Sequence, residues 1–293
     1  MALPSTQRTD SRRASLGGVR DGLERHGRSL LLIPVVLFFG LLLLGPLVGI
    51  AAGALEGGAG SWSTLESNPT VGLVVQSTVV VSIVTTVITT VLGYLVATLA
   101  WRSSGLKRLL VFGFVLLPFW TGVLVKTFAW TVLLGDHGVI NNALLATGII
   151  SAPLDLLHNQ LAVIIGMVHY CLPYAVLPIF ASMLSINFRL EQAAESLGAG
   201  GWNRLRFVLF PLARPGILAS AMLVFIISVG FFITPVILGG PRDRMVANLI
   251  DYYQAQISDF NTASLLAIIV TLAVSVLVVI YQRLPKEGQY GND

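Results

Sequence analysis

Hydrophobic residues in this sequence are gathered in six long blocks, which polar stretches separate. About 20 apolar residues in a row are needed for a helix to cross the hydrocarbon core of a membrane. The blocks do not alternate apolar and polar residues as membrane strands do, and a backbone in lipid must satisfy its own hydrogen bonds, so each block is expected to be helical. The pattern predicts membrane-spanning helices over residues 29–53, 77–100, 109–134, 161–184, 216–238 and 262–281.

The composition supports the same fold class, an all-α membrane protein. Of the 293 residues, 55% are hydrophobic and only 11% are charged, whereas soluble domains carry about 25% charged residues. So few charges cannot cover the surface of a water-soluble protein of this size. The single cysteine, Cys171, lies inside an apolar block and cannot form a disulfide within the chain.

Positive charges are distributed unevenly among the connections between the blocks. Fifteen of the eighteen Lys and Arg residues lie before the first block, after the second, after the fourth or in the C-terminal tail. Cytoplasmic connections carry such an excess, so both termini are predicted to be cytoplasmic and residues 54–76, 135–160 and 239–261 to lie outside. The net charge of +4 is therefore explained by orientation in the membrane and does not indicate nucleic-acid binding.

The two ends of the chain are polar. Residues 1–28 are basic, and their composition favours a disordered cytoplasmic segment. The apolar block that follows is longer than the 7–15 residues typical of a signal peptide, so we expect it to be retained, although the small residues at 51–54 leave cleavage as an alternative. Residues 282–293 are predicted to form a cytoplasmic tail.

The sequence contains no recognisable catalytic apparatus. It has no P-loop, no dinucleotide-binding fingerprint, no cluster of His, Asp and Glu at metal-ligand spacing and no nucleophile beside a plausible base. We therefore predict no catalytic residue, no metal site and no bound cofactor, and if ATP drives this protein, another chain must hydrolyse it. A secondary transporter driven by an ion gradient is a weaker alternative, because no acidic residue lies deep in any block.

The connection over residues 185–215 has a distinct pattern. Asn187 can cap a short helix that begins near Phe188 and ends before Gly198. One face of that helix would carry the apolar or small residues Leu190, Ala193, Ala194 and Leu197. A second amphipathic helix is expected over residues 202–209, followed by two prolines. The pattern alone fits a helix that enters a groove on a partner and fits equally an ordinary interfacial helix.

This connection resembles the "EAA" loop of permease subunits from ATP-binding-cassette (ABC) importers. The family pattern is Glu-Ala-Ala, three residues, Gly, nine residues, an aliphatic residue, any residue, an apolar residue and Pro. The chain matches it at Gln192-Ala193-Ala194, Gly198, Val208, Phe210 and Pro211, with Gln in place of the first Glu. The resemblance implies the type I importer permease fold, with six helices and a loop that docks into an ATPase subunit through Glu191, Gln192, Ala193, Ala194, Glu195 and Gly198.

Other segments resemble the spermidine/putrescine branch of that family, in its B-type subunit. They are residues 117–121, 126–130, 172–174 and 234–240. The resemblance implies import of a small solute, a polyamine such as spermidine or putrescine, by ATP-driven alternating access across the bacterial inner membrane. It further implies a second permease subunit, two ATPase subunits that bind ATP and Mg²⁺, and an extracytoplasmic solute-binding protein. Opines, phosphonates and other amines are the alternative solutes.

Aromatic residues beside prolines are the candidates for a solute pathway. Interrupted helices often line the binding sites of transporters, and aromatic faces bind cations. The candidate residues are Phe119, Trp120, Tyr170, Tyr174, Phe231 and Phe232. Packing in the core or at the membrane interface is the alternative explanation for each of them.

Three charged residues are candidates for an outer gate or for contact with the binding protein. Lys126 is the only charged residue well inside a block and lies near its outer end, where it could snorkel to the surface or pair with Asp136. Asp251 and Asp259 lie in the last outside connection, and an exposed loop without a binding role would explain them equally well.

Overall fold

The computed structural model describes residues 10–283, with side chains from Pro34 onward. The described part is helical and contains no strand, which confirms the all-α class. Five helices are long: α1 (Asp10–Ser67), α2 (Pro69–Arg102), α6 (Gln160–Met183), α9 (Phe210–Val229) and α12 (Phe260–Arg283).

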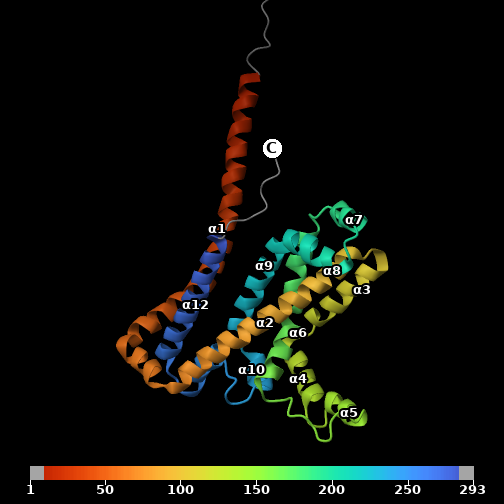
Figure 1. Ribbon diagram of the computed structural model, residues 1–293. Coiled ribbons are helices and arrows are strands. Elements are labelled where there is room, and N and C mark those ends of the chain that lie inside the picture. Colours follow the sequence, from red (N-terminus) through yellow and green to blue (C-terminus); the bar gives the residue numbers. More distant parts are fainter. Residues whose placement is uncertain (1–9, 284–293) are drawn as a thin grey trace, which may run out of the picture.

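The remaining elements are short, and most of them lie at the two ends of the bundle (Figure 1). They are α3 (Gly105–Leu116), a 3₁₀ turn (Leu117–Trp120), α4 (Val123–Leu134), α5 (Val139–Ala146), α7 (Phe188–Ser196), α8 (Gly201–Arg204), a π-helical turn (Leu205–Leu209), α10 (Ile233–Leu238), α11 (Val246–Asp251) and a second π-helical turn (Tyr252–Gln256). Within residues 10–283, six helical stretches are long and apolar enough to cross a membrane.

The centre of the bundle is formed by α2, α6 and α9, which pack against one another. Small residues lie at the contacts between these three helices. A methyl group added to Gly93 of α2 would lie 2.7 Å from the Cβ of Ala175 on α6, and one added to Gly216 of α9 would lie 3.0 Å from the Cα of Ile179. Membrane helices associate through such close packing, since lipid supplies no hydrophobic drive between them.

The first and last long helices form a separate pair. The C-terminal part of α1 contacts α12, and Gly53 of α1 leaves room for the ring of Phe260 on α12. The pair joins the centre of the bundle mainly through a cluster near α11, which includes Leu65, Val74 and Leu249. Figure 1 shows the pair (red-orange and blue) leaning away from the other helices at the end that carries α7.

Two of the expected spans are interrupted. The third block, 109–134, is divided into α3, the 3₁₀ turn and α4, because Pro118 opens the turn and the chain is extended at Thr121 and Gly122. The fifth block, 216–238, is helical only to Val229, and α10 begins after a break at residues 230–232. In contrast, α6 continues through Pro173 and Pro178.

Helical structure extends beyond the expected spans at three places. Residues 10–28, predicted to be disordered, form the start of α1, consistent with their content of the helix formers Arg, Leu, Glu and Ala; residues 1–9 lie outside the described part. The expected loop 54–76 is helical apart from a bend at Gly58, where φ is 44°, and the Asn68 cap of α2. The loop before α9 is helical from Gly201, and Pro211 is tolerated because it lies in the first turn of α9. Of the predicted tail, residues 284–293 lie outside the described residues.

The close contact between α2 and α6 gives a test of the fold. We expect Gly93→Ala to lower the stability of the folded protein by about 1–3 kcal/mol, because the new methyl group would overlap Ala175. Thermal unfolding in detergent measures the effect. Gly72→Ala is the matched control on the same helix, since nothing lies within 4 Å of the added methyl group, and it should leave stability unchanged or slightly raised. Equal effects of both substitutions would contradict this packing.

Candidate functional site

The expected short helix in the 185–215 connection is α7, and its ends are fixed by local sequence. The side chain of Asn187 accepts a hydrogen bond from the backbone N–H of Arg189, which caps the first turn. Beyond the last turn, Gly198 has a φ of 81°, and its N–H donates to the carbonyl of Glu195. That conformation strongly favours glycine and ends the helix.

One face of α7 has no partner within the described chain. Leu190 is 48% exposed and Leu197 is 88% exposed. Ala193 and Gln192 are exposed as well, and Ala194 is partly buried. The small and apolar face expected from the sequence is therefore open to approach by another surface.

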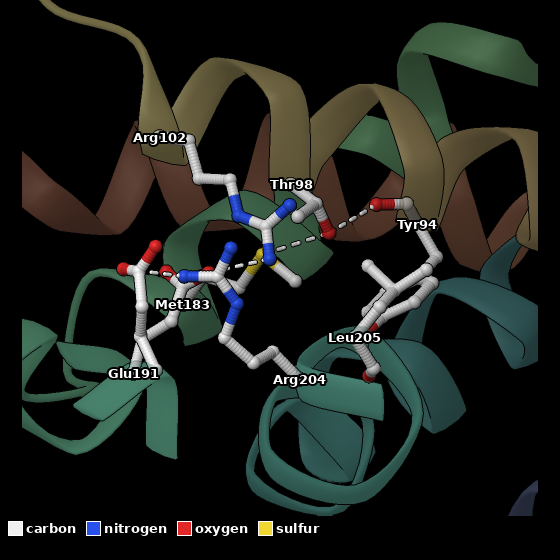
Figure 2. A network of polar contacts seen from close by, with 8 residues as sticks. Tyr94, Thr98, Arg102, Met183, Glu191, Arg204 and Leu205 are labelled. Atoms are coloured by element: carbon white, nitrogen blue, oxygen red, sulfur yellow. Dashed lines mark hydrogen bonds and ion pairs between the residues drawn. The ribbon is translucent and has the colours of Figure 1, made fainter. Parts of the chain in front are cut away.

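The opposite face of α7 contacts the bundle through ion pairs. Glu191 is only 3% exposed. Its carboxylate forms an ion pair with Arg102, at the end of α2, and lies 3.9 Å from the guanidinium of Arg204 in α8. We call these three residues the charge cluster; Figure 2 shows them converging from three elements. The more exposed carboxylate of Glu195 forms a further ion pair with the guanidinium of Arg204, with 2.7 Å between the nitrogen and oxygen atoms. The charge cluster borders a cavity of about 290 Å³.

The residues that the family resemblance assigned to the ATPase contact differ in exposure. Glu191 is buried against Arg102 and Arg204, whereas Gln192 and Ala193 are exposed. No sequence pattern indicates this arrangement, because Arg102 and Glu191 are 89 positions apart and each has an ordinary explanation as a charged residue near a helix end.

A second contact joins α2 to the same connection. The hydroxyl of Tyr94 donates a 2.7 Å hydrogen bond to the carbonyl of Leu205, which also accepts from the N–H of Phe210 in the π-helical turn. The ring of Tyr94 packs edge-on against Phe210, with 5.8 Å between centroids. Tyr94, Thr98 and Arg102 are spaced four apart, so they lie along one face of α2. The four-residue spacing of these polar residues could have indicated a shared contact face on α2, and it was not identified from the sequence.

Comparison with known proteins identifies the family. Residues 60–285 match the model of the binding-protein-dependent transport system inner membrane component. The chain belongs to this family. The spermidine/putrescine transport system permease protein PotB of Haemophilus influenzae is 33% identical over 219 residues, which are 75% of this chain and 77% of that protein. PotB of Escherichia coli K12 is 30% identical over 193 residues, 66% of this chain and 70% of that protein.

A solved structure shares the fold of this permease. A chain in the crystal structure of a bacterial alginate ABC transporter, in complex with a periplasmic protein that holds an alginate pentasaccharide, superposes with a TM-score of 0.75 at 18% identity. The match covers 89% of the permease and 94% of that chain. The family and fold predicted from the sequence are thus confirmed. The protein is a permease subunit of an ABC importer, a transport component and not an enzyme.

Four of the six candidate pathway aromatics come together where the interrupted helices meet α6. Tyr170 stacks on Tyr174 at 5.7 Å and meets Phe231 edge-on at 4.7 Å, and Phe119 lies 5.6 Å from Tyr174. The breaks at 117–122 and 230–232 place Phe119 and Phe231 in this aromatic cluster. Trp120 is 88% exposed instead.

The three candidate gate residues lie in different environments. The ammonium of Lys126 lies 5.0 Å from the ring centroid of Tyr170, against the aromatic cluster. No ion pair joins it to Asp136 in the described part of the chain. Asp259 caps α12 by accepting from the N–H of Thr262, and Asp251 borders a second cavity.

This second cavity has a volume of about 340 Å³ and lies at the end of the bundle opposite α7. Phe232, Tyr252, Arg244 and Asp251 line it together with Asn248. The amide of Asn248 accepts from the N–H of Met245 and donates to the carbonyl of Phe232, both at 2.9 Å. One buried side chain therefore fixes α11 to the break that follows α9.

Loss of that side chain should loosen the outer connection. We expect Asn248→Ala to destabilise the fold by about 1–3 kcal/mol, since it leaves the buried N–H of Met245 without a partner and removes one of the two hydrogen bonds to the carbonyl of Phe232. Hydrogen exchange of residues 239–257, followed by mass spectrometry, measures the effect locally. Asn142→Ala, which removes an exposed hydrogen bond to His137, is the control. Unchanged protection of the segment in Asn248→Ala would contradict the assignment.

Proposed function

We propose that this permease imports a polyamine such as spermidine or putrescine. The observation that carries the proposal is the likeness to PotB proteins over two thirds to three quarters of the chain. The aromatic cluster supports it, because the ring faces of Tyr170, Tyr174, Phe119 and Phe231 can bind ammonium groups within ~6 Å of their centroids. One chain would supply half of the translocation pathway.

The proposal includes a set of partners in the bacterial inner membrane. A second permease subunit would complete the pathway, and a binding protein would deliver the solute at the end that carries α10, α11 and Asp251. Two ATPase subunits, which hold ATP and Mg²⁺, would bind at the α7 end. The excess of Lys and Arg in the connections at that end supports a cytoplasmic location for α7 and for both termini.

The exposed face of α7 is the proposed contact with the ATPase. Ala193 and Ala194 allow a partner to approach closely, and Leu190 and Leu197 offer apolar area that nothing in the described chain covers. Such a face suits recognition of a helix in a groove. Gln192 lies on the accessible side and Gly198 ends the helix, so both belong to the proposed contact region.

Lys126 favours a second candidate solute. An ammonium group inside a membrane bundle is expensive and marks a functional site by default. The ammonium of Lys126 lies against the aromatic cluster, and no described residue forms an ion pair with it. An anionic opine or phosphonate would find a counter-charge there, whereas a polyamine would be repelled and would compete with Lys126 for the ring of Tyr170.

Obstruction of the α7 face should prevent docking. We expect Ala193→Phe to reduce copurification of the ATPase subunit and solute uptake by about tenfold or more, because an interface anchor of this kind is worth roughly 2 kcal/mol. Quantitative copurification and uptake in proteoliposomes measure both. Ala146→Phe, at an exposed alanine of α5 at the other end of the bundle, is the control. Normal ATPase binding by Ala193→Phe would refute docking at this face.

Replacement of Lys126 separates the two candidate solutes. With a polyamine, Lys126→Met should leave uptake intact or lower its KM by about two- to fivefold, because the competing ammonium contributes roughly 0.5–1 kcal/mol on the ring. Uptake of labelled putrescine and spermidine into proteoliposomes measures this, with Lys126→Arg as the control that keeps the charge. A binding protein that prefers anions, together with loss of uptake in Lys126→Met, would overturn the polyamine assignment in favour of an anionic solute.

A further inference from the structure

The α7 end of the bundle holds a network that neither docking nor the solute pathway requires. Arg102 and Tyr94 of α2 contact two different parts of the 185–215 connection, at Glu191 and at Leu205 (Figure 2). We propose that this face of α2 receives the movement of α7, and that Glu191 is the positioning residue that makes α7 and α2 move together. The proposal rests on the docking of an ATPase at α7.

The two sides of α7 have different partners. Successive residues of an α-helix are turned by about 100°, so Glu191 and Ala193 point roughly 200° apart. Ala193 is exposed on the side proposed for docking, and Glu191 is buried on the side of the bundle. A force applied at the exposed side therefore reaches the bundle through the charge cluster and the ring contact of Phe188 with Trp101, which is 5.2 Å between centroids.

The C-terminal connection of α7 makes a poor transmitter of that force. On its C-terminal side the chain passes through Gly198, Gly200 and Gly201 before α8 begins. Glycine allows many backbone conformations, so this segment can absorb a displacement without passing it on. The ion pair between Arg102 and Glu191 bypasses the glycines, and Arg204 lies beyond them and is held by the same carboxylate.

The receiving helix leads directly to the centre of the bundle. Tyr94 follows Gly93, where α2 packs closely against Ala175 of α6. Tyr94 and Trp101 belong to one buried cluster with Ile179 and Met183 of α6 and Leu209 of the π-helical turn. Packed side chains and stiff helices of this kind carry coupling between distant sites. A shift of α7 thus reaches α6 and α9 through α2.

Glu191→Gln tests the assignment in the complete importer, with ATPase subunits and binding protein, in proteoliposomes. We expect the ATPase subunits to remain bound and to continue hydrolysing ATP, while solute uptake falls on the order of tenfold. The ATP consumed per solute molecule therefore rises by the same factor. Lys107→Gln is the control, because Lys107 is an exposed charged residue of α3 outside the charge cluster and its loss should keep the ratio of the wild type.

Arg102→Gln opens the same contact from α2 without altering α7. It should raise the ATP consumed per solute in the same way, and the double variant should be no worse than either single one, because both remove one interaction. If Glu191→Gln fails to assemble, Arg102→Gln carries the test. Unchanged ATP per solute in Arg102→Gln, or an equal fall of uptake and ATP hydrolysis in the variants, would overturn the proposal. Failure of the docking proposal itself would show separately, as normal ATPase binding by Ala193→Phe.

Discussion

The close approach of α2, α6 and α9 at small residues is the constraint on which the rest of the molecule depends. Gly93 faces Ala175, and Gly216 faces the backbone around Ile179. These contacts fix how α2 lies across α6, and thereby where its last turns end. Tyr94 and Arg102 reach the 185–215 connection only because the helix that carries them is seated at Gly93. The coupling face is thus a consequence of how tightly three helices pack.

Interrupted helices determine the arrangement of the aromatic cluster. The breaks at 117–122 and 230–232 place Phe119 and Phe231 against Tyr174 and Tyr170. A break exposes backbone groups that an intact helix would satisfy, and within the membrane these groups need other partners. The carbonyl of Phe232 accepts from the N–H of Val236 and from the amide of Asn248, and the second bond connects the outer connection to the break beside Phe231.

The sequence predicted the fold class, the family and the position of α7, because each depends on local signals: long apolar runs, the Asn187 cap and the spacing of Ala193 and Gly198. It did not predict where helices break. Pro118 interrupts one span, whereas Pro173 and Pro178 lie within an intact helix, and the difference depends on the neighbouring helices. The partners of Glu191 could not be predicted from the sequence either, since the ion pair with Arg102 arises from packing between segments that are distant along the chain.

The pairing of α1 with α12 has a consequence for the order in which the molecule is made. Within the described residues α1 precedes every other helix and α12 follows them, and more than 190 residues separate Ser67 from Phe260 along the chain. During synthesis α1 must therefore remain in the bilayer without its partner until α12 emerges. The exposed apolar side chains from Leu41 to Leu44 allow α1 to remain in the bilayer alone during that time, because a helix with such a surface is stable in lipid without a partner. Formation of this pair then joins the two helices that lie farthest apart along the described chain.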